Sequence, residues 1–258
     1  MSTMDAAYNL PQAGTLPTRE LRAEPNPWGF WGSLGWSAFA MATGVFAVFV
    51  FTIIWMLTHG LLVVNPEDKH FATATGILIL SAPLIVLAIA TKIRKFSLRD
   101  YFALDGFSRR DLAIGLICLM ALIVGFGAIE TLLGIDGGSK HVEATYRAAK
   151  AAGALPLLWF SVVVVAPVTE ELFFRGFLHR GWAPSWLGVS GTIVLTSALW
   201  AVLHQQYNVF GILLIFVMGL IFGWMRQRSS STLLPMVLHT VNNLLATVLV
   251  TLQVEWLS

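Results

Sequence analysis

Two carboxylates and a guanidinium, Glu170, Glu171 and Arg175, interrupt an apolar stretch of this chain. The run before them, residues 157–166, is apolar apart from one serine. A charge at the middle of a membrane span costs about 2.5–3.5 kcal/mol on insertion scales, so such groups usually face a protein interior or a water-filled cavity. Their presence therefore predicts a functional site within a membrane helix.

Helix geometry separates the roles of these charges. Glu171 and Arg175 are four residues apart on one face, which favours an ion pair. Glu170 lies about 100° round the helix and stays free for chemistry. A purely structural ion pair explains Glu171 and Arg175 but leaves Glu170 without a partner. Pro167 cannot donate to Val163, so we expect the helix to open locally before the charges.

Two later apolar segments carry further polar groups. His204 ends one of them, and His239 lies in the last, with Asn243 one turn later on the same face. Each alone can be a hydrogen-bonding group that joins helices. With Glu170 they form a set of one acid, two imidazoles and one amide. His179, near the end of its own span, is interpreted as interfacial.

This set fits peptide hydrolysis without a covalent intermediate. Glu170 would take a proton from water, as a general base does. His204 would hold that water or donate to the leaving amine. His239 and Asn243 would stabilise the oxyanion, and one such donor is worth about 10²–10³ in rate.

Two histidines and a glutamate also match a catalytic zinc site, with Glu170, His204 and His239 as ligands. The sequence has no His-Glu-x-x-His motif, so these ligands would come from three helices. Asparagine is a poor zinc ligand and a good oxyanion donor. No carboxylate lies within one turn of His239 to orient it, as a zinc-bound histidine usually requires. We therefore favour a site without a bound metal and keep zinc as the alternative.

The ordered motifs resemble a known family. Glu-Glu-x-x-x-Arg at residues 170–175, the single His204, and His-x-x-x-Asn at residues 239–243 are similar to the CAAX protease and bacteriocin-processing (CPBP, Abi) family, which includes the Ras-converting-enzyme type of CAAX prenyl protease. The resemblance covers about Leu155 to Val254. It implies an intramembrane endopeptidase in which Glu170 activates water beside His204, and His239 and Asn243 are the oxyanion donors. Both metal-dependent and metal-free mechanisms have been held for this family. The chain departs from it at Trp200, where phenylalanine is common, which bears on the shape of the pocket.

Composition places the chain in a membrane. Of its 258 residues 57% are hydrophobic and 12% are charged, against about 25% charged in soluble domains. The net charge of +2 gives no reason to expect nucleic-acid binding. The single cysteine, Cys118, excludes a disulfide within the chain.

We predict an all-α, polytopic transmembrane bundle with about seven spans. Residues 1–35 form a polar cytoplasmic tail, residues 36–134 hold the first three helices, and residues 155–254 form the peptidase-like core. Residues 92–111 are read as an interfacial segment and residues 139–153 as a short helix outside. The expected spans are Trp36–Leu57, Phe71–Thr91, Leu112–Gly134, Leu155–Arg180, Leu187–His204, Val209–Trp224 and Leu233–Val254. The fifth and sixth are the shortest, and they can form a tight hairpin that does not reach the far interface.

Lys and Arg residues predict the orientation. Twelve of the sixteen lie in the tail and in the loops on the same side. Cytoplasmic loops carry such an excess. We therefore expect a cytoplasmic N-terminus and an outside C-terminus, in a bacterial inner membrane.

The substrate class is less determined than the chemistry. A membrane-tethered protein or peptide fits a site within the bilayer, and the sequence gives no reason to expect prenylated substrates. A non-catalytic membrane scaffold or bacteriocin-immunity-like protein that keeps the motifs for packing is the main alternative. A proton-coupled transporter is a third reading, although the chain lacks the repeated halves common in transporters.

Overall fold

The protein is described here by a computed structural model, which covers residues 26–59, 69–135 and 139–257. These residues form helices and connecting turns without a strand, so the all-α class is confirmed. The predicted tail lies largely outside the described residues, because only residues 26–35 of it are covered. The first helix begins within those residues, at Phe30.

Within the described ranges, six helical segments are long and apolar enough to cross a membrane. The fifth expected span, Leu187–His204, is the exception: it contains α9 (Gly188–Val202), whose 15 residues reach only about 22 Å. A full crossing needs about 17–25 residues, so the expected seven spans correspond to six candidate spans and one short apolar helix. The six are α1 (Phe30–His59), α2 (Lys69–Ile93, apolar from Ala74), α4 (Arg109–Leu133), the segment Leu155–Trp182, α10 (Val209–Ser229) and α11 (Leu233–Leu252), which continues to Trp256.

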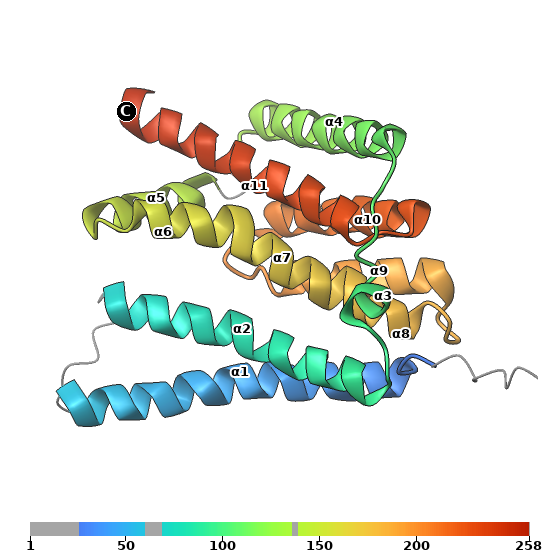
Figure 1. The fold of residues 1–258 in the computed structure, drawn as a ribbon. Helices are drawn as coiled ribbons and strands as arrows, with labels where there is room; N and C mark the ends of the chain where they lie inside the picture. The colour runs from blue at the N-terminus through green and yellow to red at the C-terminus, as the bar shows by residue number, and fades with distance from the viewer. Residues whose placement is uncertain (1–25, 60–68, 136–138, 258) are drawn as a thin grey trace, which may run out of the picture.

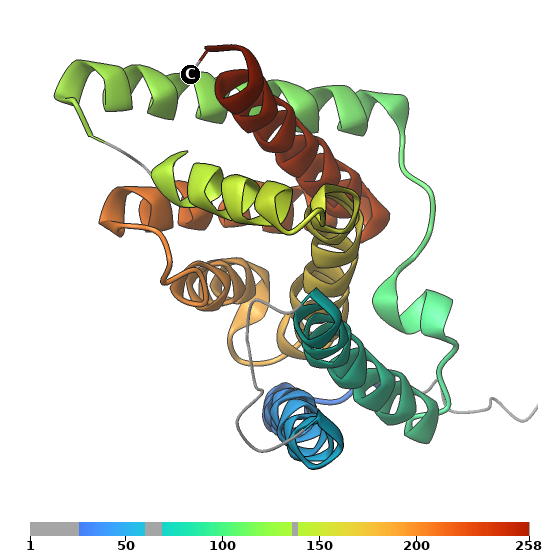
Figure 2. The same ribbon diagram turned by 90° about the vertical axis from the view of Figure 1, so that its left-hand side faces the viewer.

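The helices lie in layers around the segment Leu155–Trp182 (Figures 1 and 2). The α1–α2 hairpin packs on one side of this segment, and α11 packs on the other. α4 lies beyond, against α10 and α11, and the short α9 packs along α10. The central segment carries the predicted charges, so they are surrounded by protein.

The central segment is not a regular α-helix. It runs through α6 (Leu155–Phe160), a π-helical turn η1 (Ser161–Val165), α7 (Ala166–Glu171), a second π-helical turn η2 (Leu172–Leu178) and α8 (His179–Trp182). Pro167 is the second residue after the first π-helical turn, so the predicted opening before the charges is confirmed.

The opening frees one backbone carbonyl. In η1 the Ala166 N–H donates to Ser161 O, five residues back. The next donor in this register would be Pro167, which has no N–H. Val162 O therefore lacks a helical donor, and it accepts a hydrogen bond of 2.8 Å from Nδ2 of Asn243 on α11.

Two glycines of α10 allow α9 to approach closely. A Cβ added at Gly219 would lie 2.8 Å from Ser197 Cβ, and one at Gly223 would lie 2.8 Å from Ile193 Cγ2. Asn208 caps the start of α10 by accepting from Gly211 N, directly after the short α9. The predicted tight hairpin is present, and it places the end of α9 at the depth of the central charges.

The two connections that were expected to be ordered contain helices. Residues 92–111 hold α3 (Leu98–Phe102), capped by Ser97 and packed through Tyr101 and Phe102. The second connection forms α5 (Ser139–Ala151). Tyr146 and Lys150 of α5 both bond to Glu255 near the end of α11.

Candidate active site

The predicted ion pair is present and buried. Arg175 Nη1 donates to Glu171 Oε1 over 3.1 Å, and the two side chains are 1% and 0% exposed. Arg175 Nη2 also donates to Gly219 O on α10, over 3.3 Å. Removing either partner of a buried ion pair lowers the stability of the fold, because the other charge loses its counterion.

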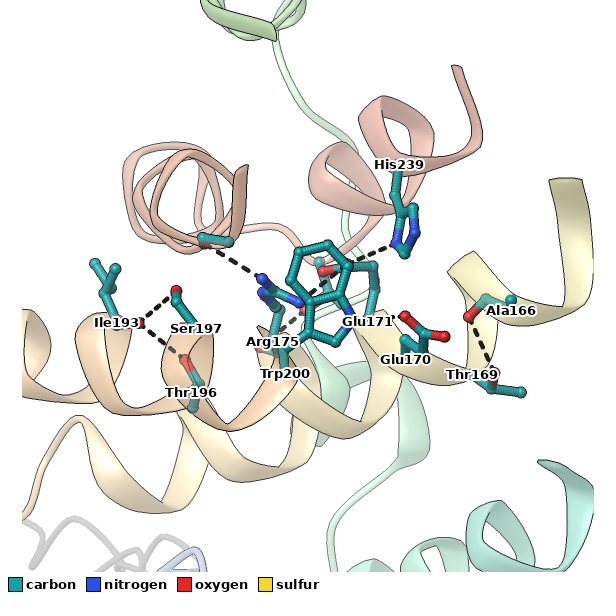
Figure 3. A network of polar contacts seen from close by, with 12 residues as sticks. Ala166, Thr169, Glu170, Glu171, Arg175, Ile193, Thr196, Ser197, Trp200 and His239 are labelled. Carbon is teal, nitrogen blue, oxygen red and sulfur yellow. Dashed lines mark hydrogen bonds and ion pairs between the residues drawn. The ribbon is translucent and has the colours of Figure 1, made fainter. Parts of the chain in front are cut away.

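Glu171 has a second partner that the sequence did not predict. His239 Nδ1 lies 3.0 Å from Glu171 Oε1, and the imidazole is 5% exposed (Figure 3). A carboxylate accepts, so Nδ1 carries the hydrogen. The neutral ring then presents Nε2 as an acceptor, and His239 can donate to an oxyanion only as an imidazolium. The helix of His239 offers no carboxylate within one turn, and the carboxylate that orients the ring is Glu171, from another helix.

Glu170 is separate from this ion pair, as the helix geometry predicted, but it is not without a partner. Trp200 Nε1 donates to Glu170 Oε2 over 2.6 Å. Glu170 is half-buried, and Trp200 is 2% exposed. The only hydrogen bond that the described part of the chain gives the Glu170 carboxylate is therefore the one from this indole.

His204 stands just beyond the end of α9. Its Nδ1 lies 2.8 Å from the carbonyl oxygen of Trp200, which can only accept, so Nδ1 donates. Nε2 of the neutral ring is then an acceptor, suited to hold a water molecule by its proton. A full-length fifth span would place His204 at a different depth from Glu170 and His239. The short α9 removes this difference.

Trp200 contacts each of the three groups. Its ring lies edge-to-face with His204 at 5.3 Å and with His239 at 5.2 Å between centroids. The Arg175 guanidinium carbon lies 4.7 Å from the Trp200 ring centroid, within range of a cation–π contact. Figure 3 shows the indole between Arg175 and Glu170. The residues predicted from three separate segments therefore meet around one tryptophan.

Asn243 lies at the edge of this arrangement. Its Nδ2 donates to Val162 O, and its Oδ1 accepts from Asn242 Nδ2 over 3.1 Å. An amide nitrogen has two hydrogens. One N–H of Asn243 is therefore used by a backbone carbonyl, and the hydrogen bonds of the described residues leave the second without an acceptor.

Tyr207 was missed by the sequence analysis. Its ring lies 6.2 Å from that of His204 and 5.6 Å from that of His141 on α5. Burial and the negative charge of Glu170 raise the pKa of the Tyr207 phenol. The sequence pointed to Tyr207 only by its position, three residues after His204 and between the expected fifth and sixth spans.

His179 differs from its interpretation as interfacial. The side chain is 4% exposed, and its Nε2 has no hydrogen-bond partner among the described residues. It lies inside the bundle because α8 continues the central segment against α1 and α9. A histidine near the end of a span is thus not always at the membrane interface.

The alternative zinc site requires Glu170, His204 and His239 to converge on one point. Within the described ranges no group of three or more His, Cys, Asp or Glu side chains is arranged to hold a metal ion. Glu170, His204 and His239 surround Trp200 rather than a common point. The set does not fit zinc in this conformation, and we derive no step through a metal.

Comparison with known proteins supports the motif reading. Residues 152–245 match the family model described as Type II CAAX prenyl endopeptidase Rce1-like. The matched residues contain all three motifs, and the match is consistent with a CPBP-family intramembrane protease. An uncharacterized 24.3 kDa protein of Escherichia coli is 36% identical over 89 residues, which are 32% of this chain. The chain spans 39% of the length of that relative. No solved structure matches the chain.

Proposed function

We propose that this integral membrane protein is an intramembrane endopeptidase that cleaves membrane-tethered proteins or peptides. The observation that carries the proposal is the separation of the two adjacent glutamates. Glu171 is bound to Arg175 and His239, whereas among the described residues the half-buried Glu170 bonds only to Trp200, whose ring also contacts His204. One carboxylate is thus neutralised, and the other is left to act on a substrate.

In the proposed reaction, Glu170 removes a proton from a water molecule held by His204 Nε2. The water oxygen attacks the peptide carbonyl carbon, and the negative charge moves to the carbonyl oxygen. The imidazolium of His239 and the second N–H of Asn243 stabilise that oxyanion. Glu170 then passes its proton to the amide nitrogen, the C–N bond breaks, and the amine leaves. Glu171 and Arg175 position His239.

The experiment uses the purified chain in proteoliposomes with a library of peptides anchored by a lipid or by a single membrane helix. Mass spectrometry of the products identifies the cleaved bond. We expect cleavage by the wild type and cleavage about 10²–10⁴-fold slower by Glu170→Gln, whose amide oxygen still accepts from Trp200. Lipid-anchored peptides with and without a prenyl group decide whether a prenyl chain is required. Equal cleavage by the wild type and by Glu170→Gln would refute the proposal.

A second candidate function is a non-catalytic membrane scaffold or bacteriocin-immunity-like protein. The observation in its favour is that His239 bonds to Glu171 and Asn243 bonds to Val162 O, so both side chains already satisfy groups of the bundle. In that case Glu170→Gln retains full function in cells. The same variant therefore separates the two candidates.

We also propose an orientation with the N-terminus in the cytoplasm of a bacterial inner membrane. The start of α1 and the ends of α2, α8 and α10 lie toward one end of the bundle, opposite the C-terminus (Figure 1). Most Lys and Arg residues lie at the former end, which favours it as cytoplasmic. A reporter fused after Ser258 should be active only outside the cytoplasm. Activity only inside would contradict this orientation.

A further inference from the structure

Trp200 is the one aromatic side chain of the described site that both binds Glu170 and touches the two histidines. Its indole N–H reaches Glu170 Oε2 at 2.6 Å, and its ring meets His204, His239 and Arg175. It is 2% exposed, so water does not compete for the N–H. These contacts come from three different helical segments.

The chemistry of indole suits this place. An indole N–H donates and cannot accept. It can therefore hold the Glu170 carboxylate without competing for the proton that Glu170 takes from water. A bond from a neutral donor to an ionised acceptor is stronger than one between neutral groups. A phenyl ring at the same position keeps the edge-to-face contacts but offers no donor, and one Glu170 oxygen then loses its partner.

The ring is itself held in place. Arg175 lies against its face, and Arg175 is fixed by Glu171 and by Gly219 O. Phe222 of α10 adds a ring contact at 5.9 Å between centroids. The position of the Glu170 carboxylate is therefore coupled, through the indole, to the buried ion pair.

We propose that Trp200 is a positioning residue: its indole N–H fixes the Glu170 carboxylate, and its ring sets the places of His204 and His239. The inference deepens the proposed function and rests on it, since positioning matters only if Glu170 acts on water. It assigns a role in the reaction to a side chain that has no acid–base chemistry of its own.

The contact is tested without any activity measurement. The chain holds ten tryptophans, so indole ¹⁵N labelling gives a small set of N–H cross-peaks in an NMR spectrum of the protein in micelles. Trp200→Phe and Trp182→Phe remove and so assign two of them. Trp182 is a matched control, because it is 1% exposed and its Nε1 donates to a backbone oxygen, Phe30 O, at 3.2 Å.

Glu170→Gln should move the Trp200 cross-peak upfield in the proton dimension, because a neutral amide oxygen accepts more weakly than a carboxylate. The Trp182 cross-peak should stay in place. A Trp200 cross-peak that does not respond to Glu170→Gln overturns the proposal, whatever the protein's activity.

The role is tested on a peptide that the wild type cleaves. Trp200→Phe should lower kcat about 10- to 100-fold, as loss of a hydrogen bond to a charged group does, and should change KM less than about twofold. Trp182→Phe should leave kcat unchanged even where it lowers Tm as much. Trp200→Phe should not reduce the residual rate of Glu170→Gln any further.

Three results are decisive. A kcat for Trp200→Phe equal to that for Trp182→Phe overturns the positioning role, even if the cross-peak moves. A rise in KM for Trp200→Phe with kcat unchanged also overturns the positioning role. If no peptide is cleaved by the wild type, the proposed function fails and the positioning role fails with it, while a moving cross-peak still establishes the indole–carboxylate contact.

Discussion

The α1–α2 hairpin and the region from α6 to α11 both bury side chains between helices, but the types of buried residue differ. The buried residues of α1 are small: Ser33, Ser37, Ala40 and Gly44. Among the residues whose burial is described, the buried charged and histidine side chains all lie from α7 onward, and they are Glu171, Arg175, His179, Arg226 and His239. Both regions face a bilayer, so the difference does not come from the environment.

Small residues let two helices approach and need few partners, whereas each buried charge needs a specific one. Gly44 lies against Pro83 and the carbonyl of Ile79, which is sufficient to pack α1 on α2. Arg175 needs Glu171 and Gly219 O. The region from α6 to α11 therefore maintains a costly polar arrangement, as the proposed function requires.

The largest expected effect is the loss of activity in Glu170→Gln. Removing a general base lowers kcat by about 10²–10⁴-fold. The Tm should stay close to that of the wild type, because the amide oxygen still accepts from Trp200. Cleavage rate and thermal unfolding measured on one preparation check this. A matched loss of both quantities would mean that Glu170 belongs to the structural part of the region.

Glu171→Ala and Arg175→Ala should have the next largest effect, on stability. Glu171→Ala leaves the buried Arg175 without a counterion, and Arg175→Ala leaves the buried Glu171 with His239 alone. Removing one partner of a buried ion pair costs about 3–5 kcal/mol. We expect low folded yield and a large fall in the midpoint of unfolding in a mild detergent. The exposed pair Arg99–Asp105, with side chains 71% and 57% exposed, is the control, because its removal should cost below about 1 kcal/mol. Wild-type stability of both alanine variants would contradict the ion pair.

A matched pair of glycine substitutions compares the two regions directly. Gly219→Ala places a methyl group 2.8 Å from Ser197 Cβ, so α9 must shift. Overpacking of this kind costs about 1–3 kcal/mol. Gly44→Ala meets its nearest atoms at 3.2 Å and should change stability by less than about 1 kcal/mol. Unfolding midpoints rank the two, and only Gly219→Ala should also reduce cleavage, because it displaces Trp200 and His204. Equal effects would remove the distinction between the regions.

The smallest expected effect is that of metal removal. We expect exhaustive chelation to leave cleavage unchanged, because the second region supplies a base and oxyanion donors from its own side chains. Elemental analysis of active protein accompanies the assay. Stoichiometric zinc, with activity lost to the chelator and restored by zinc, would make Glu170, His204 and His239 ligands and overturn the metal-free mechanism.

The sequence by itself determined the helical class, six of the spans, the Glu171–Arg175 pair and the distortion at Pro167. Each of these depends on residues close together in the chain: hydrophobic length, i to i+4 spacing, and a missing N–H. The 15-residue length of α9 was also foreseeable, because its apolar run is short.

Only the tertiary structure decided which groups from different helices meet. Glu171 binds His239 although 68 residues separate them, and Trp200 binds Glu170 across 30 residues. Tyr207, His179 and the bond from Asn243 to Val162 O belong to the same class of contact. A helix period fixes the face on which a side chain lies but not the neighbour that this face meets. That neighbour depends on how the helices pack, and here the packing depends on the close approach of α9 to the glycines of α10.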